Sequence, residues 1–200
     1  MKKLLQINAS LFSNDGQSSR LANQFVDAWR DRNPDSELSV RDFAREPIPH
    51  LDAERFQAFL TQPDARTPEQ AAVVDFSDTL IRELREADVL VIGLPMYNFG
   101  IPSTLKAYFD HVARAGITFR YTENGPVGLL DGKKVYVLAA RGGYYVGTPR
   151  DSQTGYMRDF LGFLGMKDVE FVYAEGLNID ESSKQAALAE AGARLANLAA

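Results

Sequence analysis

The chain has 200 residues, of which 45% are hydrophobic and 24% charged, and a formal net charge of −5. This composition is that of one large globular domain, so residues 1–200 are expected to form a single domain. The negative charge and the lack of a basic run argue against a nucleic-acid partner. No apolar run reaches the roughly 20 residues of a membrane span. Gln6 and Asn8 cut the N-terminal apolar run too short for a signal peptide, and a cytoplasmic protein is expected.

The sequence has no cysteine and two histidines, His50 and His111. The lack of cysteine excludes disulfides, thiolate nucleophiles and iron–sulfur ligation. The histidines do not have a metal-binding spacing, and no metal site is predicted. His111 falls between the apolar positions of a helical pattern, which favours a solvated histidine over a ligand or an acid–base group. Redox chemistry would therefore require a bound organic cofactor.

Strand and helix patterns alternate along the chain. Strands are indicated by short apolar or alternating runs, and helices by apolar residues three or four positions apart. In chain order we expect strand 2–8, helix 18–32, strand 37–43, a short helix 52–60, helix 68–86, strand 89–94, helix 103–115, strand 134–140, helix 154–164, strand 169–173 and helix 181–198. The connection over 117–132 is predicted to contain neither a helix nor a buried strand.

Two of the predicted strands indicate how the sheet is arranged. Residues 37–43 are largely polar, which is typical of an edge strand. Residues 89–94 are apolar at consecutive positions, which is typical of a central strand buried on both faces. Alternation of strands and helices favours a parallel sheet covered by helices on both faces. The sequence therefore predicts an α/β fold with five parallel strands.

In open α/β sheets, ligands bind beyond the carboxyl ends of the strands. The loop after the first strand is rich in hydroxyl groups and leads into a helix, whose first N–H groups attract anions. Ser10, Ser18 and Ser19 could add hydroxyl donors, and Gln17 an amide, which suits the phosphate of a monoester. The alternative is that Ser18 or Ser19 merely caps the helix.

Two nucleotide-binding motifs are absent. The sequence has no GxxxxGK[ST], which argues against a P-loop NTPase, and no GxGxxG, which argues against a Rossmann dinucleotide site. A phosphate cradle made of serines is what a mononucleotide such as FMN would use in the strand order 2-1-3-4-5.

The loops after the third and fourth strands could hold a flat ring. In the first of them, Met96, Tyr97 and Phe99 would form a polarisable wall for an isoalloxazine, unless they merely pack under the following helix. In the second, Gly142 and Gly143 allow a ligand to approach the backbone closely. All three loops fall on one edge of the sheet.

Over its whole length the chain resembles the FMN-dependent NADH-azoreductases, a branch of the flavodoxin-like quinone reductases. The most specific stretches are Pro95–Phe99, Leu105–Asp110, Ala113–Gly128 and Arg141–Gly143. The resemblance implies a flavodoxin-like fold with five parallel strands in the order 2-1-3-4-5. It also implies three groups of FMN-binding residues: Ser10, Gly16, Gln17 and Ser18 for the phosphate; Pro95, Met96, Tyr97, Asn98 and Phe99 for the ring and ribityl chain; and Ala140, Arg141, Gly142 and Gly143 for the polar edge of the ring.

The chain departs from this family at two of these positions. Members often have serine where this chain has Gly16 and Ala140, so two hydroxyl donors are missing, but the backbone N–H groups remain and FMN binding is expected to persist. The family is also homodimeric, with aromatic residues of one subunit near the flavin of the other. By position these are Phe119 and Tyr121, interpreted as an exposed pair that lines the substrate pocket.

The implied activity is the reduction of quinones and aromatic azo compounds by NADH, as a two-electron ping-pong hydride transfer on one flavin face. Backbone N–H groups beside the ring would stabilise its negative charge. No general acid is assigned, and the choice of NADH over NADPH rests on the resemblance alone. One rival is a flavodoxin-like electron carrier without efficient NADH oxidation. Another is a cofactor-free receiver domain, disfavoured because strand 89–94 ends in Leu-Pro-Met instead of an acidic cluster.

Overall fold

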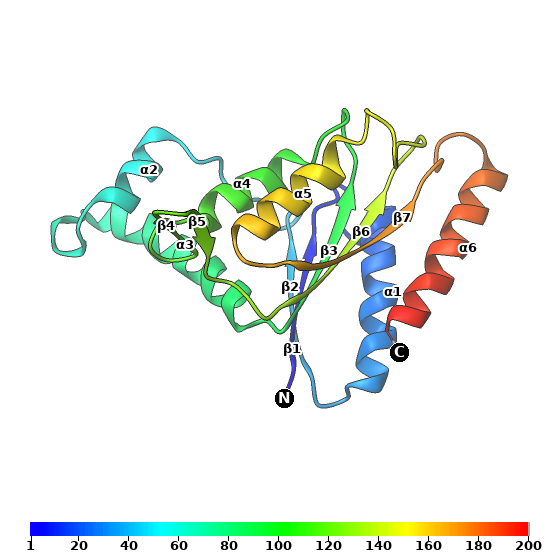
Figure 1. Ribbon diagram of the computed structural model, residues 1–200, viewed down its shortest axis with the longest axis horizontal. Helices are drawn as coiled ribbons and strands as arrows, with labels where there is room; N and C mark the ends of the chain where they lie inside the picture. The colour runs from blue at the N-terminus through cyan, green and yellow to red at the C-terminus, as the bar shows by residue number, and fades with distance from the viewer. Residues whose placement is uncertain (200) are drawn as a thin grey trace.

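The structure, a computed structural model, describes residues 1–199. Its centre is a parallel sheet of five strands in the order β2-β1-β3-β6-β7 (Figure 1). In that order the strands are β2 (Glu37–Asp42), β1 (Lys3–Asn8), β3 (Val89–Pro95), β6 (Lys134–Ala140) and β7 (Asp168–Ala174). The predicted order 2-1-3-4-5 is confirmed, because β6 and β7 are the fourth and fifth strands of this sheet.

Burial along the strands follows their place in the sheet. Every residue of β3 is buried, as expected for a central strand whose two faces are both covered. The edge strand β2 has no buried residue, which agrees with its polar sequence. Successive residues of β1 face opposite sides, so Leu4 belongs to one half of the core and Leu5 to the other.

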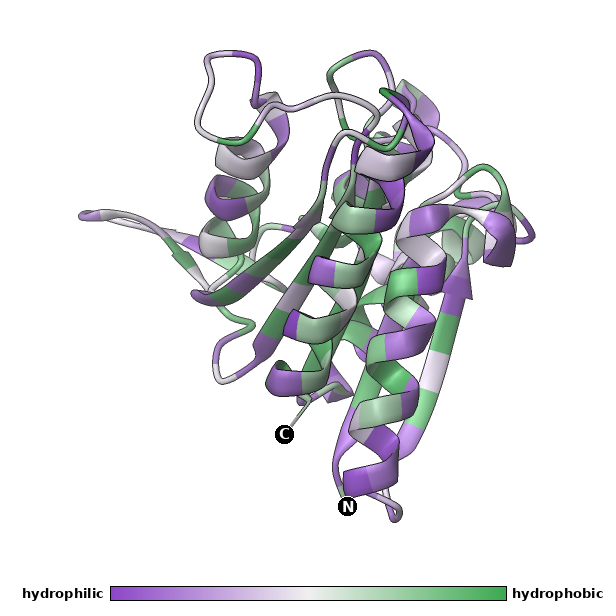
Figure 2. Ribbon diagram, turned by 90° about the vertical axis from the view of Figure 1, so that its right-hand side faces the viewer, coloured by the Kyte–Doolittle hydropathy of each residue, from purple (hydrophilic) through white to green (hydrophobic). Residues whose placement is uncertain are grey.

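Helices cover both faces of the sheet (Figures 1 and 2). On one face, α1 (Gln17–Arg32) and α6 (Glu181–Leu198) pack against the strands. The other face carries α3 (Pro68–Glu86), α4 (Ser103–Val112) and α5 (Ser152–Phe163). Figure 2 shows apolar residues along the strands between these layers. In residues 1–199, none of the helices has both the length and the apolar character needed to cross a membrane.

Several predicted helix boundaries shift by one to three residues. The helix α5 begins at Ser152 and not at Thr154, because the Asp151 side chain caps it by accepting a hydrogen bond from the Thr154 N–H at 3.1 Å. The helix α4 ends at Val112 and not at Ala115. There the Thr118 hydroxyl donates to the Val112 carbonyl at 2.6 Å, which satisfies one of the unpaired carbonyls at the helix end.

Residues 46–68 form an excursion that contains the short helix α2 (Ala53–Leu60) and folds against α3 and α4. This covers His111, which is fully buried, so its assignment as a solvated histidine is wrong. Its Nε2 donates to the Pro49 carbonyl at 3.0 Å, and the rings of Phe59 and Phe76 pack edge-on against it. The local pattern around His111 could not reveal the excursion that covers it.

The connection over 117–132 contains an antiparallel hairpin of β4 (Phe119–Thr122) and β5 (Gly125–Gly128), which the sequence did not predict as strands. Phe119 is only 7% exposed, and its ring centroid lies 4.4 Å from that of Phe163 on α5. Tyr121, two residues nearer the hairpin tip, is 74% exposed. The prediction of an exposed pair is therefore wrong for Phe119, because α5 covers the base of the hairpin, and right for Tyr121.

Candidate functional site at the carboxyl edge of the sheet

The loops that follow β1, β3 and β6 lie side by side at the carboxyl edge of the sheet, as the sequence predicted (Figure 1). The Ala9 N–H donates to the Gly93 carbonyl at 3.2 Å, and the Met96 N–H donates to the Ala140 carbonyl at 3.2 Å. These two bonds continue the strand register into the loops. Residues far apart in the sequence, such as Ser10 and Gly143, are thereby brought to one edge of the sheet.

The first turn of α1 has the properties of an anion-binding site. Gly16 is its N-cap and provides no side-chain hydrogen bond, and no acidic residue lies in the turn. The hydroxyl oxygens of Ser18 and Ser19 are buried without a hydrogen-bond partner, and neither serine caps the helix. Three helical N–H groups, the positive end of the helix dipole and two unpaired hydroxyls therefore gather at this point.

Gly16 and Gly93 allow close packing of the loop after β1 (residues 9–16), here called the phosphate-side loop, and of the start of α1. A Cβ at Gly16 would lie 2.0 Å from the Ser10 Oγ and 2.5 Å from the Ser10 Cβ, so a serine could stand there only after a backbone shift. A Cβ at Gly93 would lie 2.9 Å from the Ser18 carbonyl oxygen. The start of α1 therefore rests directly on the backbone of β3.

The loop after β3 folds into a strained turn over Tyr97–Gly100, here called the ring turn. Tyr97 and Gly100 exchange backbone hydrogen bonds of 3.2 and 2.9 Å. The two central residues, Asn98 and Phe99, have φ angles of 49° and 65°, a left-handed conformation that glycine adopts readily and phenylalanine does not. Within residues 1–199, the N–H groups of Asn98 and Phe99 donate to no protein acceptor.

Tyr97 also connects the ring turn to the phosphate-side loop. Its hydroxyl oxygen accepts a hydrogen bond from the Leu11 N–H at 3.1 Å. The two loops are therefore held at a fixed separation by a contact between residues 86 positions apart. A ligand that spans both loops would find them already aligned.

The loop after β6 presents N–H groups while its carbonyls are paired. The carbonyls of Arg141, Gly142 and Gly143 accept hydrogen bonds of 3.0 to 3.1 Å from the N–H groups of residues 176–178, after β7. In the part of the chain that the structure describes, the N–H groups of Gly142 and Gly143 have no protein acceptor. Together with Asn98 and Phe99, they leave four backbone donors at this edge.

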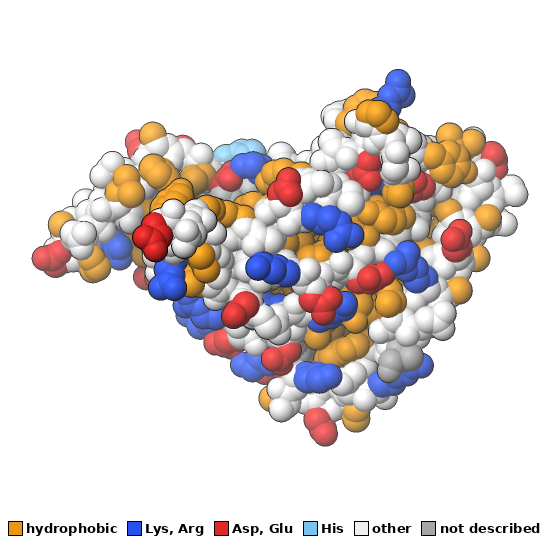
Figure 3. All heavy atoms as spheres, in the orientation of Figure 1, with side chains coloured by type: hydrophobic (Ala, Val, Ile, Leu, Met, Phe, Trp, Pro, Cys, Tyr) orange, Lys and Arg blue, Asp and Glu red, His pale blue; other side chains and the backbone are white. Residues whose placement is uncertain are grey.

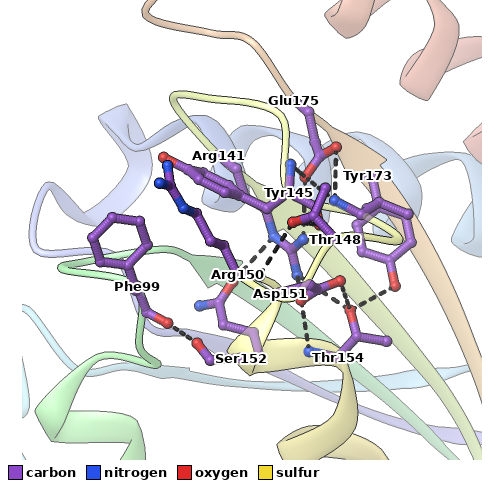
Figure 4. Close-up of polar contacts among 12 residues, drawn as sticks. Phe99, Arg141, Tyr145, Thr148, Arg150, Asp151, Ser152, Thr154, Tyr173 and Glu175 are labelled. Atoms are coloured by element: carbon purple, nitrogen blue, oxygen red, sulfur yellow. Dashed lines mark hydrogen bonds and ion pairs between the residues drawn. The ribbon is translucent and has the colours of Figure 1, made fainter.

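The Arg141 side chain does not line the edge but lies in the interior, fully buried (Figure 4). Its guanidinium pairs with Asp151 at 2.9 Å and with Glu175 at 3.1 Å, and lies 5.0 Å from the Tyr173 ring centroid. Burial disfavours the Asp151 carboxylate, but hydrogen bonds from Arg141 and Thr154 outweigh burial and lower the pKa of Asp151 below its usual value. Arg141 can therefore contribute only its backbone to the edge.

The loops after β1, β3 and β6 each carry an exposed aromatic side chain. Phe12, Phe99 and Tyr144 are exposed, and the Phe99 ring meets the Tyr145 ring edge-on at 5.8 Å. In Figure 3 the upper outline is hollowed between the excursion on the left and the loops after β3 and β6 on the right. Cavities of about 520, 580 and 540 Å³ lie between α2 and α3, between β7 and α6, and at the amino edge of the sheet, and none of these three is lined by the ring turn. We assign the site by its hydrogen-bonding groups and not by cavity size.

Sequence reasoning missed the residues that support the site from α5. Asp151 and Thr154 form a capping pair with the spacing of a helix start, and that spacing could have been recognised in the sequence. Gln153 has no local signal, although it is fully buried and its amide contacts two carbonyls of the β3 loop.

The chain is similar in sequence to a known family and to several known proteins. A family model described as a flavodoxin-like fold matches residues 2–199. The chain is 58% identical to an FMN-dependent NADH:quinone oxidoreductase of Cellvibrio japonicus, over 95% of this chain and 96% of that protein. It is 56% identical to FMN-dependent NADH:quinone oxidoreductase 6 of Burkholderia lata, over the full length of both.

Two solved structures from Bacillus anthracis are also similar. One is an azoreductase, with a TM-score of 0.91 and 29% identity, covering 100% of this chain and 99% of that one. The other is an FMN-dependent NADH-azoreductase in complex with FMN, with a TM-score of 0.89 and 29% identity over 100% of both chains. The backbone arrangement is thus shared with a protein that holds FMN.

Proposed function

This chain belongs to the flavodoxin-like family of FMN-dependent NADH:quinone oxidoreductases, and from that premise we propose that it reduces quinones and aromatic azo compounds with electrons from NADH. One observation carries the proposal: an anion-binding helix start and four unpaired backbone donors meet at one edge of the sheet. A phosphate at one end and a polar flat ring at the other match those two sets of donors.

The residues present fit FMN. The buried, unpaired hydroxyls of Ser18 and Ser19 lack acceptors, and a phosphate monoester would supply them. In our proposal the phosphate is held by Ser10, Gly16, Gln17 and Ser18, the ring and ribityl chain by Pro95, Met96, Tyr97, Asn98 and Phe99, and the polar edge of the ring by Ala140, Arg141, Gly142 and Gly143. Bound FMN supplies the two-electron chemistry, accepting hydride from NADH and passing electrons to the acceptor.

The chain itself contributes positioning and electrostatics. With FMN bound, the N–H groups of Asn98, Phe99, Gly142 and Gly143, which have no protein acceptor, would stabilise negative charge on the ring without reorganising. The carboxylates of Asp151 and Glu175 are paired with Arg141, and the pKa of Asp151 is lowered, so that Asp151 stays ionised at neutral pH. We therefore propose that protons for the acceptor come from solvent.

We also propose that the active form is a homodimer. The hollow above α4 is open, and Tyr121 extends from the hairpin with most of its surface exposed. Tyr121 would cover the flavin site of the partner subunit, while Phe119 would support the hairpin from its buried position. Sedimentation equilibrium tests this directly: a dimer supports the proposal, and a monomer at micromolar concentration rejects it.

The activity is tested by anaerobic addition of NADH to the FMN-loaded protein, followed by a quinone, while the flavin absorbance is recorded. Rapid bleaching by NADH and full recovery on addition of the quinone are expected. If FMN binds but NADH bleaches it no faster than free flavin, the protein is an electron carrier. If FMN does not bind, the site assignment is wrong.

A further inference from the structure

The ring turn requires support from outside itself. Two consecutive residues other than glycine, Asn98 and Phe99, have positive φ angles, each of which costs free energy. Such a conformation persists only where neighbouring groups determine it. The two backbone hydrogen bonds between Tyr97 and Gly100 do not by themselves fix this conformation. Turns of lower strain can form the same bonds.

That support comes from the first turn of α5. The Gln153 side-chain amide nitrogen donates one hydrogen bond to the Pro95 carbonyl at 2.9 Å and another to the Gly100 carbonyl at 3.0 Å. The Pro95 carbonyl precedes the ring turn and the Gly100 carbonyl belongs to its last residue, so one side chain holds both ends of the turn. Beside Gln153, the Ser152 hydroxyl donates to the Phe99 carbonyl, within the turn itself (Figure 4).

Arg141 fixes the orientation of the Gln153 amide. The Arg141 Nε donates to the Gln153 Oε1 at 3.2 Å. The reverse amide orientation would place an NH₂ group against a guanidinium and an oxygen against two carbonyl oxygens, so only the observed orientation satisfies all three contacts. Arg141 is itself held by Asp151 and Glu175, and Glu175 also accepts hydrogen bonds from the N–H groups of Tyr145 and Val146.

We propose that Gln153 is a positioning residue for flavin binding, which holds the ring turn in its strained form and keeps the N–H groups of Asn98 and Phe99 available to the ring. Through Arg141 it couples the loop after β3 to the loop after β6, so that both sets of ring donors are placed together. This inference rests on the proposed function, because the ring it serves is that of FMN.

The test compares three variants. Gln153→Met keeps the volume of the side chain and removes both donors. Ser152→Ala removes the single contact from an exposed residue and is expected to fold normally. Lys133→Met is the matched control: the Lys133 ammonium also donates to two carbonyls, those of Arg85 and Ala87, but at the opposite edge of the sheet. Its loss leaves two unpaired carbonyls without disturbing the ring turn.

Each purified apoprotein is titrated with FMN by fluorescence quenching, and the midpoint potential of the bound flavin and the urea midpoint of the apoprotein are recorded. Gln153→Met should raise the Kd for FMN at least about tenfold and shift the potential, Ser152→Ala should raise the Kd about threefold, and Lys133→Met should lower stability with the Kd and potential unchanged.

The outcomes separate this inference from the proposed function. If Gln153→Met loses stability as Lys133→Met does but keeps the wild-type Kd and potential, the positioning role is overturned and the function stands. Should Gln153→Met fail to fold, Ser152→Ala decides, because an unchanged Kd and potential in that variant overturn the role. If the wild-type protein does not bind FMN, the proposed function itself fails.

Discussion

Two buried cations flank β6, one at each edge of the sheet, and their surroundings differ. Lys133, before the strand, is 8% exposed and donates to the carbonyls of Arg85 and Ala87 at 2.7 and 2.6 Å, closing the end of α3. Burial lowers the pKa of Lys133, against opposing effects of Asp88 and Asp131. Arg141, after the strand, is paired with two carboxylates and a glutamine amide. Lys133 thus pairs with carbonyls at the end of α3, whereas Arg141 connects side chains that support the loops of the site.

The backbone differs between the two edges in the same way. The residues other than glycine with positive φ in residues 1–199, namely Ser13, Asn98 and Phe99, lie in loops at the carboxyl edge. At the amino edge, the positive-φ positions Gly132 and Gly165 are glycines, which adopt that conformation at little cost. Backbone strain thus gathers at the edge where a ligand would bind, whereas the amino edge uses glycines at the positions where φ is positive.

The largest expected effect comes from removing Arg141. Arg141→Met leaves the carboxylates of Asp151 and Glu175 partly buried without their partner, and it should lower the free energy of unfolding by about 3–5 kcal/mol. Urea denaturation of the apoprotein measures this loss. Lys133→Met, which leaves only neutral carbonyls unpaired, should cost about 1–3 kcal/mol.

A surface control sharpens this result. Arg194 pairs with Glu170 on the exposed side of α6, and Arg194→Met should change stability by less than about 1 kcal/mol. Equal losses for Arg141→Met and Lys133→Met would contradict the contrast between the two edges.

The next effect is on binding. Ser18→Ala removes a buried hydroxyl that has no protein partner, so the apoprotein should keep or slightly increase its stability. The same change should weaken FMN binding by about 1.5–3 kcal/mol, because a hydrogen bond to a charged phosphate is lost. Isothermal titration calorimetry with FMN, and with riboflavin as a ligand that lacks the phosphate, measures the difference. A similar loss with riboflavin would place Ser18 away from the phosphate.

How far the sequence predicts this molecule depends on whether a signal is local. The sequence predicted the strands of the sheet and the loops after β1, β3 and β6. The apolar runs, prolines and glycines that indicate them are neighbours in the chain. Gln153 was not predicted, because its role depends on α5 returning to carbonyls of the β3 loop, the farther of which lies 58 positions earlier. The burial of Phe119 and His111 was missed for the same reason, since α5 and the excursion cover them only in the folded chain.

A third effect comes from close packing between α1 and β3. Gly93→Ala would bring a Cβ to 2.9 Å from the Ser18 carbonyl oxygen, so the backbone must shift, and the variant should lose about 1–3 kcal/mol of stability together with affinity for FMN. Gly155→Ala on α5 is the control, because a Cβ there meets no atom within 4 Å and alanine should stabilise the helix by about 0.5–1 kcal/mol. Thermal unfolding of both variants, with and without FMN, decides.

The smallest effect concerns His111, an unpaired buried group outside both edges. Its Nδ1 has no partner, and its pKa is lowered, chiefly by burial, against the opposing hydrogen bond to Pro49. Because the unfolded chain then binds a proton at higher pH than the folded one, stability from this group is complete above about pH 6.5. It is lost as the pH falls toward the folded-state pKa, at no more than about 1.4 kcal/mol per pH unit.

His111→Gln isolates this contribution, because glutamine can still donate to the Pro49 carbonyl but does not titrate between pH 7.5 and 5.5. The wild-type protein should lose more stability over that range than the variant, as measured by urea midpoints at each pH. Parallel pH dependence in the two proteins would mean that His111 takes up a proton without disturbing the excursion. The protonated Nδ1 would then have found an acceptor in the folded chain.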